Sequence, residues 1–373
     1  MFDETYSYLV RKFDYRLLAA LTPAVAALFV VVILFNGLEY GLDFKGGMWM
    51  DALTDNSIDA GKINAITGEL EAAGLKDVKA DVGFDVNTGM NKLNIQTTTV
   101  LEDNKEVKGI IARYAGDLTD YDTATVKLST KPPAGLKENL VKRLKYGVDL
   151  EYGDGTLTVR SLDLNKEELD SALSYYLTEK VEVKLAKKNF NMRSVGPTLG
   201  ETFRSQGFKA LFASFVLMSI VVFFAFREFI PCVAVIQAAV CDILIALGGM
   251  SLLHIPLEPA SIGALLMLIG YSVDTDIMLT TRTLKDRSAK FDELVDDAVK
   301  TGLTMTGTTL TALVIIYIIS VTLTQIPLWS NIAAVLIIGL LADIPATWLT
   351  NAGMIKWYVE SGGRHMKLLR RRR

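Results

Sequence analysis

The sequence predicts a polytopic α-helical membrane protein with one large α+β domain inserted after its first transmembrane helix. Half of the 373 residues are hydrophobic and the mean hydropathy is positive, which is typical of a partly membrane-embedded chain. Six apolar segments are each long enough to cross a hydrocarbon core of about 30 Å at about 1.5 Å per residue. Residues 37–206 contain no such segment and are rich in charge, so we expect them to form the large domain.

The predicted membrane part begins with a polar N-terminus, residues 1–16, and a first transmembrane helix, residues 17–36. A cleaved signal peptide is the alternative, but its apolar region is normally shorter and ends in a small-residue cleavage site, which residues 35–38 lack. Five more helices are expected within residues 207–355, before a basic tail at residues 356–373. Their predicted bounds are 208–226, 230–253, 260–281, 303–323 and 328–355.

The charges of the loops predict the orientation of these helices. Basic residues precede the first span and follow the second, fourth and sixth, which places all of these clusters on one side. The two short loops on the opposite side, residues 254–259 and 324–327, contain no Lys or Arg. By the positive-inside rule, we expect both termini to be cytoplasmic and the large domain to lie outside the cell membrane.

The large domain is expected to contain two small α+β units. Helical periodicity over residues 58–75 is followed by strand-like alternation over residues 78–86 and 92–98. The same strand–helix–strand–strand order recurs after a Lys-Pro-Pro break, which predicts a division near residues 131–134. This order is typical of antiparallel sheets of the ferredoxin-like kind, although the two halves share no visible sequence identity.

Several function classes are excluded by composition. The net charge of −3 gives no argument for a nucleic-acid partner. The two cysteines, Cys232 and Cys241, lie in one apolar segment, which argues against a disulfide framework and a cysteine zinc site. His254 and His365 lie outside any metal-ligand motif, and the chain has no nucleotide-binding loop. We therefore expect no metal and no cofactor, and any energy for work has to come from elsewhere.

Carboxylates inside the spans are the candidates for an ion or proton site. A charged group near the middle of a membrane helix costs about 2.5 to 3.5 kcal/mol on insertion scales, so it usually faces a bundle interior or a wet cavity. The candidates are Asp242, Asp274, Asp276 and Asp343. Asp242 is expected near mid-membrane, whereas Asp274 and Asp343 are expected at a similar depth in the cytoplasmic half. For each, a hydrogen-bonded structural role is the alternative.

The fourth span, residues 260–281, carries two of these acids on different faces. Asp274 shares its stripe with Gly263, Met267 and Gly270. Small residues permit close approach of another helix, so we expect Asp274 to point into the bundle. Asp276 lies about 200° round the helix and either pairs with Arg282 near the interface or takes part in coupling.

Hydroxyl groups are expected to support these acids. Tyr271 and Ser272 precede them on the fourth span. Thr304, Thr308 and Thr311 form one face of the fifth span. These threonines either bond the fourth span and its acids or bond the carbonyl groups of their own helix, as is common in membranes.

Three short motifs mark the ends of the spans and the fourth helix. They read GLDFKGG at residues 41–47, with Asp43, Gly46 and Gly47; VGPTLG at residues 195–200, with Gly196, Pro197 and Gly200; and GYSVD from Gly270 to Asp274. In these motifs and in its six spans the chain resembles SecF, within the SecD/SecF family of the resistance-nodulation-division superfamily. The segments 273–282 and 343–358 are closest to the archaeal branch. The glycines at both junctions are expected to act as hinges or tight turns.

The resemblance implies an RND-like half and a non-enzymatic helper of protein secretion. Its implied partners are SecD, the Sec translocation channel, a translocating preprotein and the lipid bilayer, and its implied energy source is an ion or proton gradient. Bacterial SecF sequences place the fourth-span acid one residue after Asp274, where this chain has Thr275, so Asp274 and Asp276 both remain candidates. The alternatives are SecD itself, half of an RND-type exporter of lipids or small molecules, and a purely structural scaffold of the Sec channel.

Overall fold

The computed structural model describes residues 15–363, except 86–87, 102–104, 129, 178–182, 286–290 and 325–326. The first fourteen residues of the expected cytoplasmic N-terminus and residues 364–373 of the basic tail lie outside the described residues. The chain divides into two compact units. We call Met1–Gly46 with Gly196–Arg373 the membrane unit, and Gly47–Val195 the α+β unit. The α+β unit is thus shorter at both ends than the expected domain of residues 37–206.

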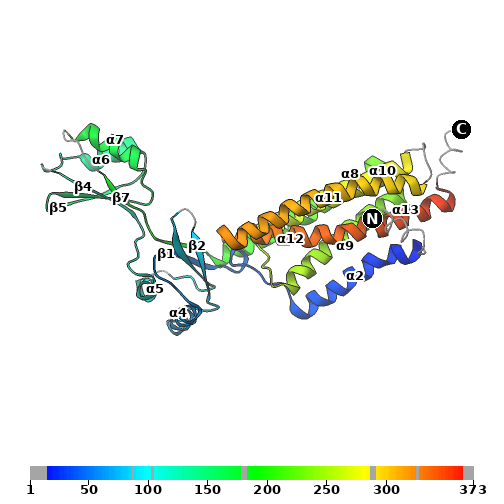
Figure 1. Ribbon diagram of the computed structural model, residues 1–373, viewed down its shortest axis with the longest axis horizontal. Helices are drawn as coiled ribbons and strands as arrows, with labels where there is room; N and C mark the ends of the chain where they lie inside the picture. The colour runs from blue at the N-terminus through cyan, green and yellow to red at the C-terminus, as the bar shows by residue number, and fades with distance from the viewer. Residues whose placement is uncertain are drawn as a thin grey trace. The chain divides into compact units, whose positions relative to one another are not determined.

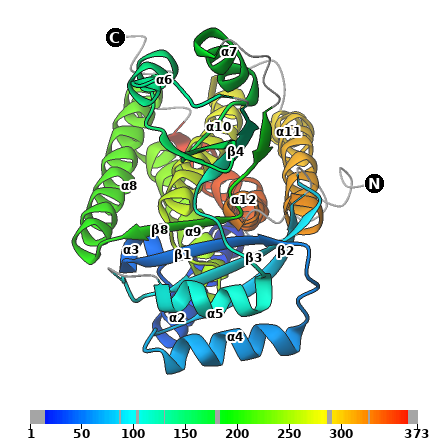
Figure 2. The same cartoon turned by 90° about the vertical axis from the view of Figure 1, so that its left-hand side faces the viewer.

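The first half of the α+β unit is a four-stranded antiparallel sheet with strand order β2-β3-β1-β8. Helices α4 and α5 cover one face of it (Figure 2). Buried residues such as Met48 and Met50 on β1 and Ile66 on α4 form the core between the layers. The elements are β1 (Gly47–Thr54), α4 (Ala60–Ala72), β2 (Lys79–Asp85), β3 (Met90–Thr97), α5 (Lys105–Ala115) and β8 (Phe190–Val195).

The second half repeats this order, with a sheet of order β5-β6-β4-β7 and its own apolar core. Its elements are β4 (Asp122–Lys127), α6 (Leu136–Leu144), β5 (Asp149–Gly153), β6 (Thr156–Ser161), α7 (Lys166–Tyr176) and β7 (Lys184–Ala186). The predicted ferredoxin-like order is confirmed twice. The predicted division near residues 131–134 is wrong, because those residues lie inside the second half, between β4 and α6. The second half is an insertion between α5 and β8 of the first.

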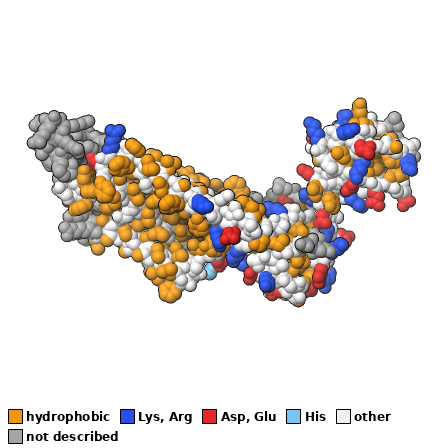
Figure 3. Space-filling view, turned by 180° about the vertical axis from the view of Figure 1, so that it is seen from behind, with side chains coloured by type: hydrophobic (Ala, Val, Ile, Leu, Met, Phe, Trp, Pro, Cys, Tyr) orange, Lys and Arg blue, Asp and Glu red, His pale blue; other side chains and the backbone are white. Residues whose placement is uncertain are grey.

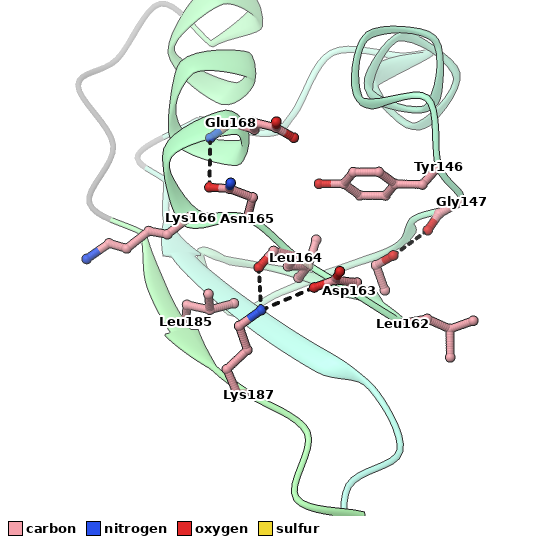
Figure 4. A pocket seen from close by; sticks show the side chains of 11 residues that line it. Tyr146, Gly147, Leu162, Asp163, Leu164, Asn165, Lys166, Glu168, Leu185 and Lys187 are labelled. Atoms are coloured by element: carbon pink, nitrogen blue, oxygen red, sulfur yellow. Dashed lines mark hydrogen bonds and ion pairs between the residues drawn. The ribbon is translucent and has the colours of Figure 1, made fainter. Parts of the chain in front are cut away.

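A buried carboxylate ties together the strands at the base of this insertion. Asp122, at the start of β4, accepts hydrogen bonds from Lys187 Nζ at 2.7 Å, from the Lys188 amide at 2.8 Å and from the Leu164 amide at 2.9 Å. Burial alone would raise the pKa of Asp122, but these bonds outweigh it and hold the pKa below its usual value. Lys187 also donates to the Leu164 carbonyl and lines a hollow of about 810 Å³ beside Tyr146 (Figure 4).

The membrane unit contains six helical spans within the described residues, which confirms the predicted number. Figure 1 shows these helices, and in Figure 3 apolar side chains dominate the surface of this unit. The helices are α2 (Tyr15–Asn36), α8 (Pro197–Phe226), α9 (Phe229–Leu252), α10 (Pro259–Lys285), α11 (Phe291–Ile319), continued by η1 (Ser320–Thr324), and α12 (Pro327–Pro345), continued by η2 (Ala346–Asn351), α13 (Ala352–Tyr358) and η3 (Val359–Gly363).

Three of the spans form the interior of the membrane unit. In the apolar stretches of α9, α10 and the α12–α13 span, 56% of the residues are buried. The corresponding shares are 6% for α8 and 11% for α11. Glycines permit the close packing of these three helices, because a side chain at Gly249 would overlap Ile338 and one at Gly339 would overlap Leu268. Polar groups on α9, α10 and α12 are therefore the ones enclosed by protein.

The sixth span changes its winding at Pro345. Proline has no backbone N–H to continue the helical ladder, and the next turn, η2, is a π-helix. This segment has buried polar side chains at Thr347, Thr350 and Asn351. The wider turn thus adds polar groups to the interior of the bundle.

Candidate functional site

The first part of the candidate site joins α9 to α10. Asp242 of α9 is buried, with 1% of its surface exposed. Ser272 Oγ of α10 donates a hydrogen bond of 2.6 Å to Asp242 Oδ2. Asp242 also lies next to Asp343 of α12, so that two carboxyl groups face each other inside the bundle.

The second part joins α10 to α12. Asp343 is fully buried, and Thr347 Oγ1 of η2 donates to its Oδ1 at 3.0 Å. Thr275 Oγ1 of α10 lies 3.2 Å from Asp343 Oδ2 and 2.8 Å from the Ser272 carbonyl oxygen. A hydroxyl group has one proton to donate. When Thr275 donates to the carbonyl, it can accept a hydrogen bond from a protonated Asp343.

The third part joins α10 to η2. Asp276 is fully buried, and Asn351 Nδ2 donates to its Oδ1 at 2.6 Å. Among the described residues, Asp276 Oδ2, Asn351 Oδ1 and Thr280 Oγ1 have no hydrogen-bond partner. Thr280 lies one turn beyond Asp276 on α10 and is also fully buried. Buried polar atoms are rarely left unpaired, so this part of the site has capacity for further hydrogen bonds.

Together these contacts make a buried network of Asp242, Asp276 and Asp343 on three helices. In the part of the chain that the structure describes, no Lys, Arg or His pairs with any of the three. An isolated carboxylate in an apolar interior is very unfavourable, so such a group takes up a proton or a cation. The arrangement is chemically suited to reversible binding of a positive charge.

Asp274 lies elsewhere, and the expectation that it points into the bundle is wrong for this chain. It is exposed, as are Gly263, Met267 and Gly270 on the same stripe. The alternative that Asp276 pairs with Arg282 is also wrong, because Arg282 pairs with Asp297 at 2.9 Å. The stripe was read correctly from the sequence, but it faces away from the other helices of the chain.

The predicted hydroxyl row on α11 does not contact the acids. Thr304, Thr308 and Thr311 are exposed, and each donates to a carbonyl group of its own helix at 2.7 to 2.8 Å. The alternative of bonding within the helix is therefore confirmed. Tyr271 is likewise exposed, whereas Ser272 bonds Asp242 as described above.

The glycine motifs meet at the end of the membrane unit where α2 ends and α8 begins. The segment after α2 forms a short helix, α3 (Leu42–Lys45), which contains Asp43 and ends at Gly46, whose φ of 78° favours glycine. Gly196 precedes α8 and Pro197 is its first residue. The chain passes from one unit to the other between Gly46 and Gly47 and again between Val195 and Gly196.

Gly200 packs directly on this segment. A Cβ atom there would lie 2.9 Å from the Phe44 carbonyl oxygen, 3.0 Å from the Gly46 nitrogen and 3.1 Å from the Asp43 carbonyl oxygen. These neighbours are backbone atoms, which cannot move away as a flexible side chain could. Gly200 thus allows α8 to pack closely on the α3 segment. The expected tight turn is found at Gly46.

Sequence reasoning did not assign roles to Thr275, Thr347 and Asn351, nor to Glu258 just before α10. The position of Thr275 between two acids on one helix could have indicated a role in the site. Thr347 follows Asp343 by one turn and could be recognised from that spacing. Asn351 enters the network through the π-helical turn, which ordinary helical spacing does not place.

Comparisons with known proteins agree with the motifs and the fold. The family model "SecD/SecF GG Motif" matches residues 31–48, and "Protein export membrane protein SecD/SecF, C-terminal" matches residues 176–361. SecF of Methanothermobacter thermautotrophicus is 31% identical over 354 residues, which cover 93% of each chain. The chain belongs to the SecD/SecF family of protein-export membrane proteins.

Other members of the SecD/SecF family match over a shorter region. SecF of Methanocaldococcus jannaschii is 50% identical over 176 residues, and SecF of Methanolacinia petrolearia is 51% identical over 170 residues. These alignments cover 47% and 46% of this chain and 62% and 60% of the relatives. The crystal structure of SecDF from Thermus thermophilus has the same fold, with a TM-score of 0.58 at 13% identity over 92% of this chain and 59% of that one.

We predict that Gly200→Val destabilises the membrane unit, because the side chain overlaps three backbone atoms of the α3 segment. A loss of about 1 to 3 kcal/mol is typical of such overpacking. Gly196→Ala is the matched control, since nothing lies within 4 Å of its Cβ position and its φ is −66°. Thermal unfolding of the purified chain in detergent measures both. Equal melting temperatures for the two variants would contradict the close-packing role of Gly200.

Proposed function

We propose that this chain is a SecF-like subunit of the Sec protein-export machinery that acts with SecD and uses an ion or proton gradient to assist translocation. The names of its relatives support a role in protein export, and the network of Asp242, Asp276 and Asp343 supports the use of a gradient. The role is that of a helper without catalytic activity of its own.

The buried network is the observation that carries this proposal. Moving one charge through 100 mV supplies about 2.3 kcal/mol. Taking up a proton removes the cost of a buried negative charge, and releasing it restores that cost. Because the acids lie on α9, α10 and α12, a change of charge alters the packing of all three helices. A population shift between two packings would then reach the junction at Gly46 and Gly200.

The orientation follows from the loop charges. Both termini would be cytoplasmic, and the α+β unit would lie outside, where it can act on a preprotein that emerges from the channel. A proton that crosses the bundle would pass between the two sides through the network. The SecDF protein of Thermus thermophilus is translocon-associated, which supports the Sec channel as a partner.

The exposed stripe of α10 supports SecD as the partner within the membrane. Gly263 and Gly270 have nothing within 4 Å of their Cβ positions, and Asp274 is exposed beside them. Glycine stripes permit close helix pairing, and a carboxylate that faced lipid would be unfavourable. We assign this face to a helix of SecD. The match to SecDF covers only 59% of the SecDF chain, which leaves room in that chain for a SecD half.

We predict that Asp276→Asn and Asp343→Asn lower gradient-dependent export by tenfold or more, since asparagine cannot bind and release a proton. Thr309→Val on α11 is a control that leaves the network unchanged. The measurement is translocation of a secreted protein into membrane vesicles that contain this chain, SecD and the Sec channel, with and without an ionophore. Asp274→Asn in the same assay tests the coupling candidate that lies outside the network.

The alternatives give different results in this assay. Unchanged ionophore-sensitive export in both variants would contradict the proposed role of the network. Export that never depends on the gradient would favour a structural scaffold. Gradient-driven release of lipids or small molecules, without an effect on export, would favour an exporter half.

We also predict that Gly270→Leu weakens co-purification with SecD, because the larger side chain fills the exposed stripe of α10. Ala213→Leu, at another small residue that is exposed on α8, is the control. Tagged variants are co-expressed with SecD, and the recovered SecD is quantified. Equal recovery with both variants would contradict the assignment of the α10 stripe to SecD.

A further inference from the structure

Glu258 lies where three parts of the membrane unit meet. It is the residue before α10, and the Ile262 amide donates to its carbonyl oxygen at 3.0 Å. Its side chain lies over Gly41, where any Cβ atom would overlap it. Asn331, in the first turns of α12, donates a hydrogen bond to its carboxylate. One carboxyl group thus contacts the motif segment and links it to the starts of α10 and α12.

The backbone is joined at the same place. Tyr40 and Leu257 form a parallel bridge, in which the Gly41 amide donates to the Leu257 carbonyl at 3.0 Å and the Leu257 amide donates to the Glu39 carbonyl at 2.7 Å. These two bonds hold residues 39–41 against the loop between α9 and α10. The Glu258 side chain follows directly after this bridge.

The electrical surroundings of Glu258 favour its neutral form. Burial, and then the nearby Asp43 carboxylate of α3, raise the pKa of Glu258 to about 7, against the opposing effect of the Asn331 hydrogen bond. Other charges at this end are engaged elsewhere. His254 Nδ1 lies 2.7 Å from Glu39 Oε1, and Arg204 of α8 lies over the Tyr40 ring. Lys45, at the end of α3, is exposed to solvent.

We propose that Glu258 is a protonation-controlled latch between the Gly41–Gly46 segment and the starts of α10 and α12. In its neutral form it packs on Gly41 beside Asp43 and keeps the segment closed. In its ionised form it repels Asp43 and draws water into the contact, so that the segment opens. The latch is independent of the aspartate network and does not require that the chain drives export.

The sign of the pH effect follows from linkage. The closed segment holds the pKa of Glu258 above its usual value of 4.5, so the open form releases its proton first. The equilibrium constant for opening of the Gly41–Gly46 segment is therefore independent of pH below about 4.5. It rises by up to about tenfold per pH unit between about 4.5 and 7 and levels off above 7.

Hydrogen exchange of the full chain in lipid nanodiscs tests this latch, with peptides that cover residues 38–46 and 252–262. Protection is corrected for the pH dependence of chemical exchange. In the unmodified chain we expect protection of these peptides to fall between about pH 5 and 7 and then to level off. In Glu258→Gln it should stay high throughout. A flat profile in the unmodified chain, or an unchanged profile in Glu258→Gln, would overturn the proposal.

Two further variants separate Glu258 from its neighbours. Glu39→Gln removes the contact with His254 and should leave the profile as it is. Loss of the pH dependence in Glu39→Gln would assign it to His254 and refute the latch. Asp43→Asn removes the like charge that raises the pKa of Glu258 in the closed segment, so the fall in protection should end at a lower pH and be smaller. This variant keeps the test decisive if Glu258→Gln does not fold.

Discussion

The burial of three carboxyl groups constrains the membrane unit more than any other feature. Asp242, Asp276 and Asp343 lie on three helices that are otherwise apolar, and each needs hydrogen-bond partners in an interior without solvent. Ser272 and Asn351 each donate to one oxygen of Asp242 and Asp276, and the other oxygen of each group has no partner among the described residues. Polar residues of α10 and η2 supply these partners, and the π-helical turn after Pro345 contains Asn351, which bonds Asp276.

The parts of the fold that depend on local pattern were predictable. Span length, loop charge and strand alternation are read within a short window, so six spans and two ferredoxin-like halves follow from the sequence. The insertion was not predictable in the same way, because β1 pairs with β8 across the whole second half. No local signal marks that pairing, and the Pro-Pro break indicated a boundary that is in fact an internal loop.

The candidate site was predictable as a set of acids but not as an arrangement. Helical spacing correctly separated the faces of Asp274 and Asp276, but small residues suit a contact within the chain and a contact with another chain equally well. Only the packing of α10 against α9 and α12 decides between them. At the junction, the motifs mark Gly41 and Gly200 in the sequence, whereas Glu258 lies far away in sequence and only its contact with Gly41 places it there.

The proposed use of a gradient requires the buried carboxyl groups to bind and release protons. Infrared difference spectroscopy of the chain with SecD in lipid vesicles measures this directly when a pH gradient is imposed. We expect a carboxylic-acid band that changes with the gradient and loses intensity in Asp276→Asn and Asp343→Asn. A band that does not respond to the gradient, or that is the same in both variants as in the unmodified chain, would contradict it.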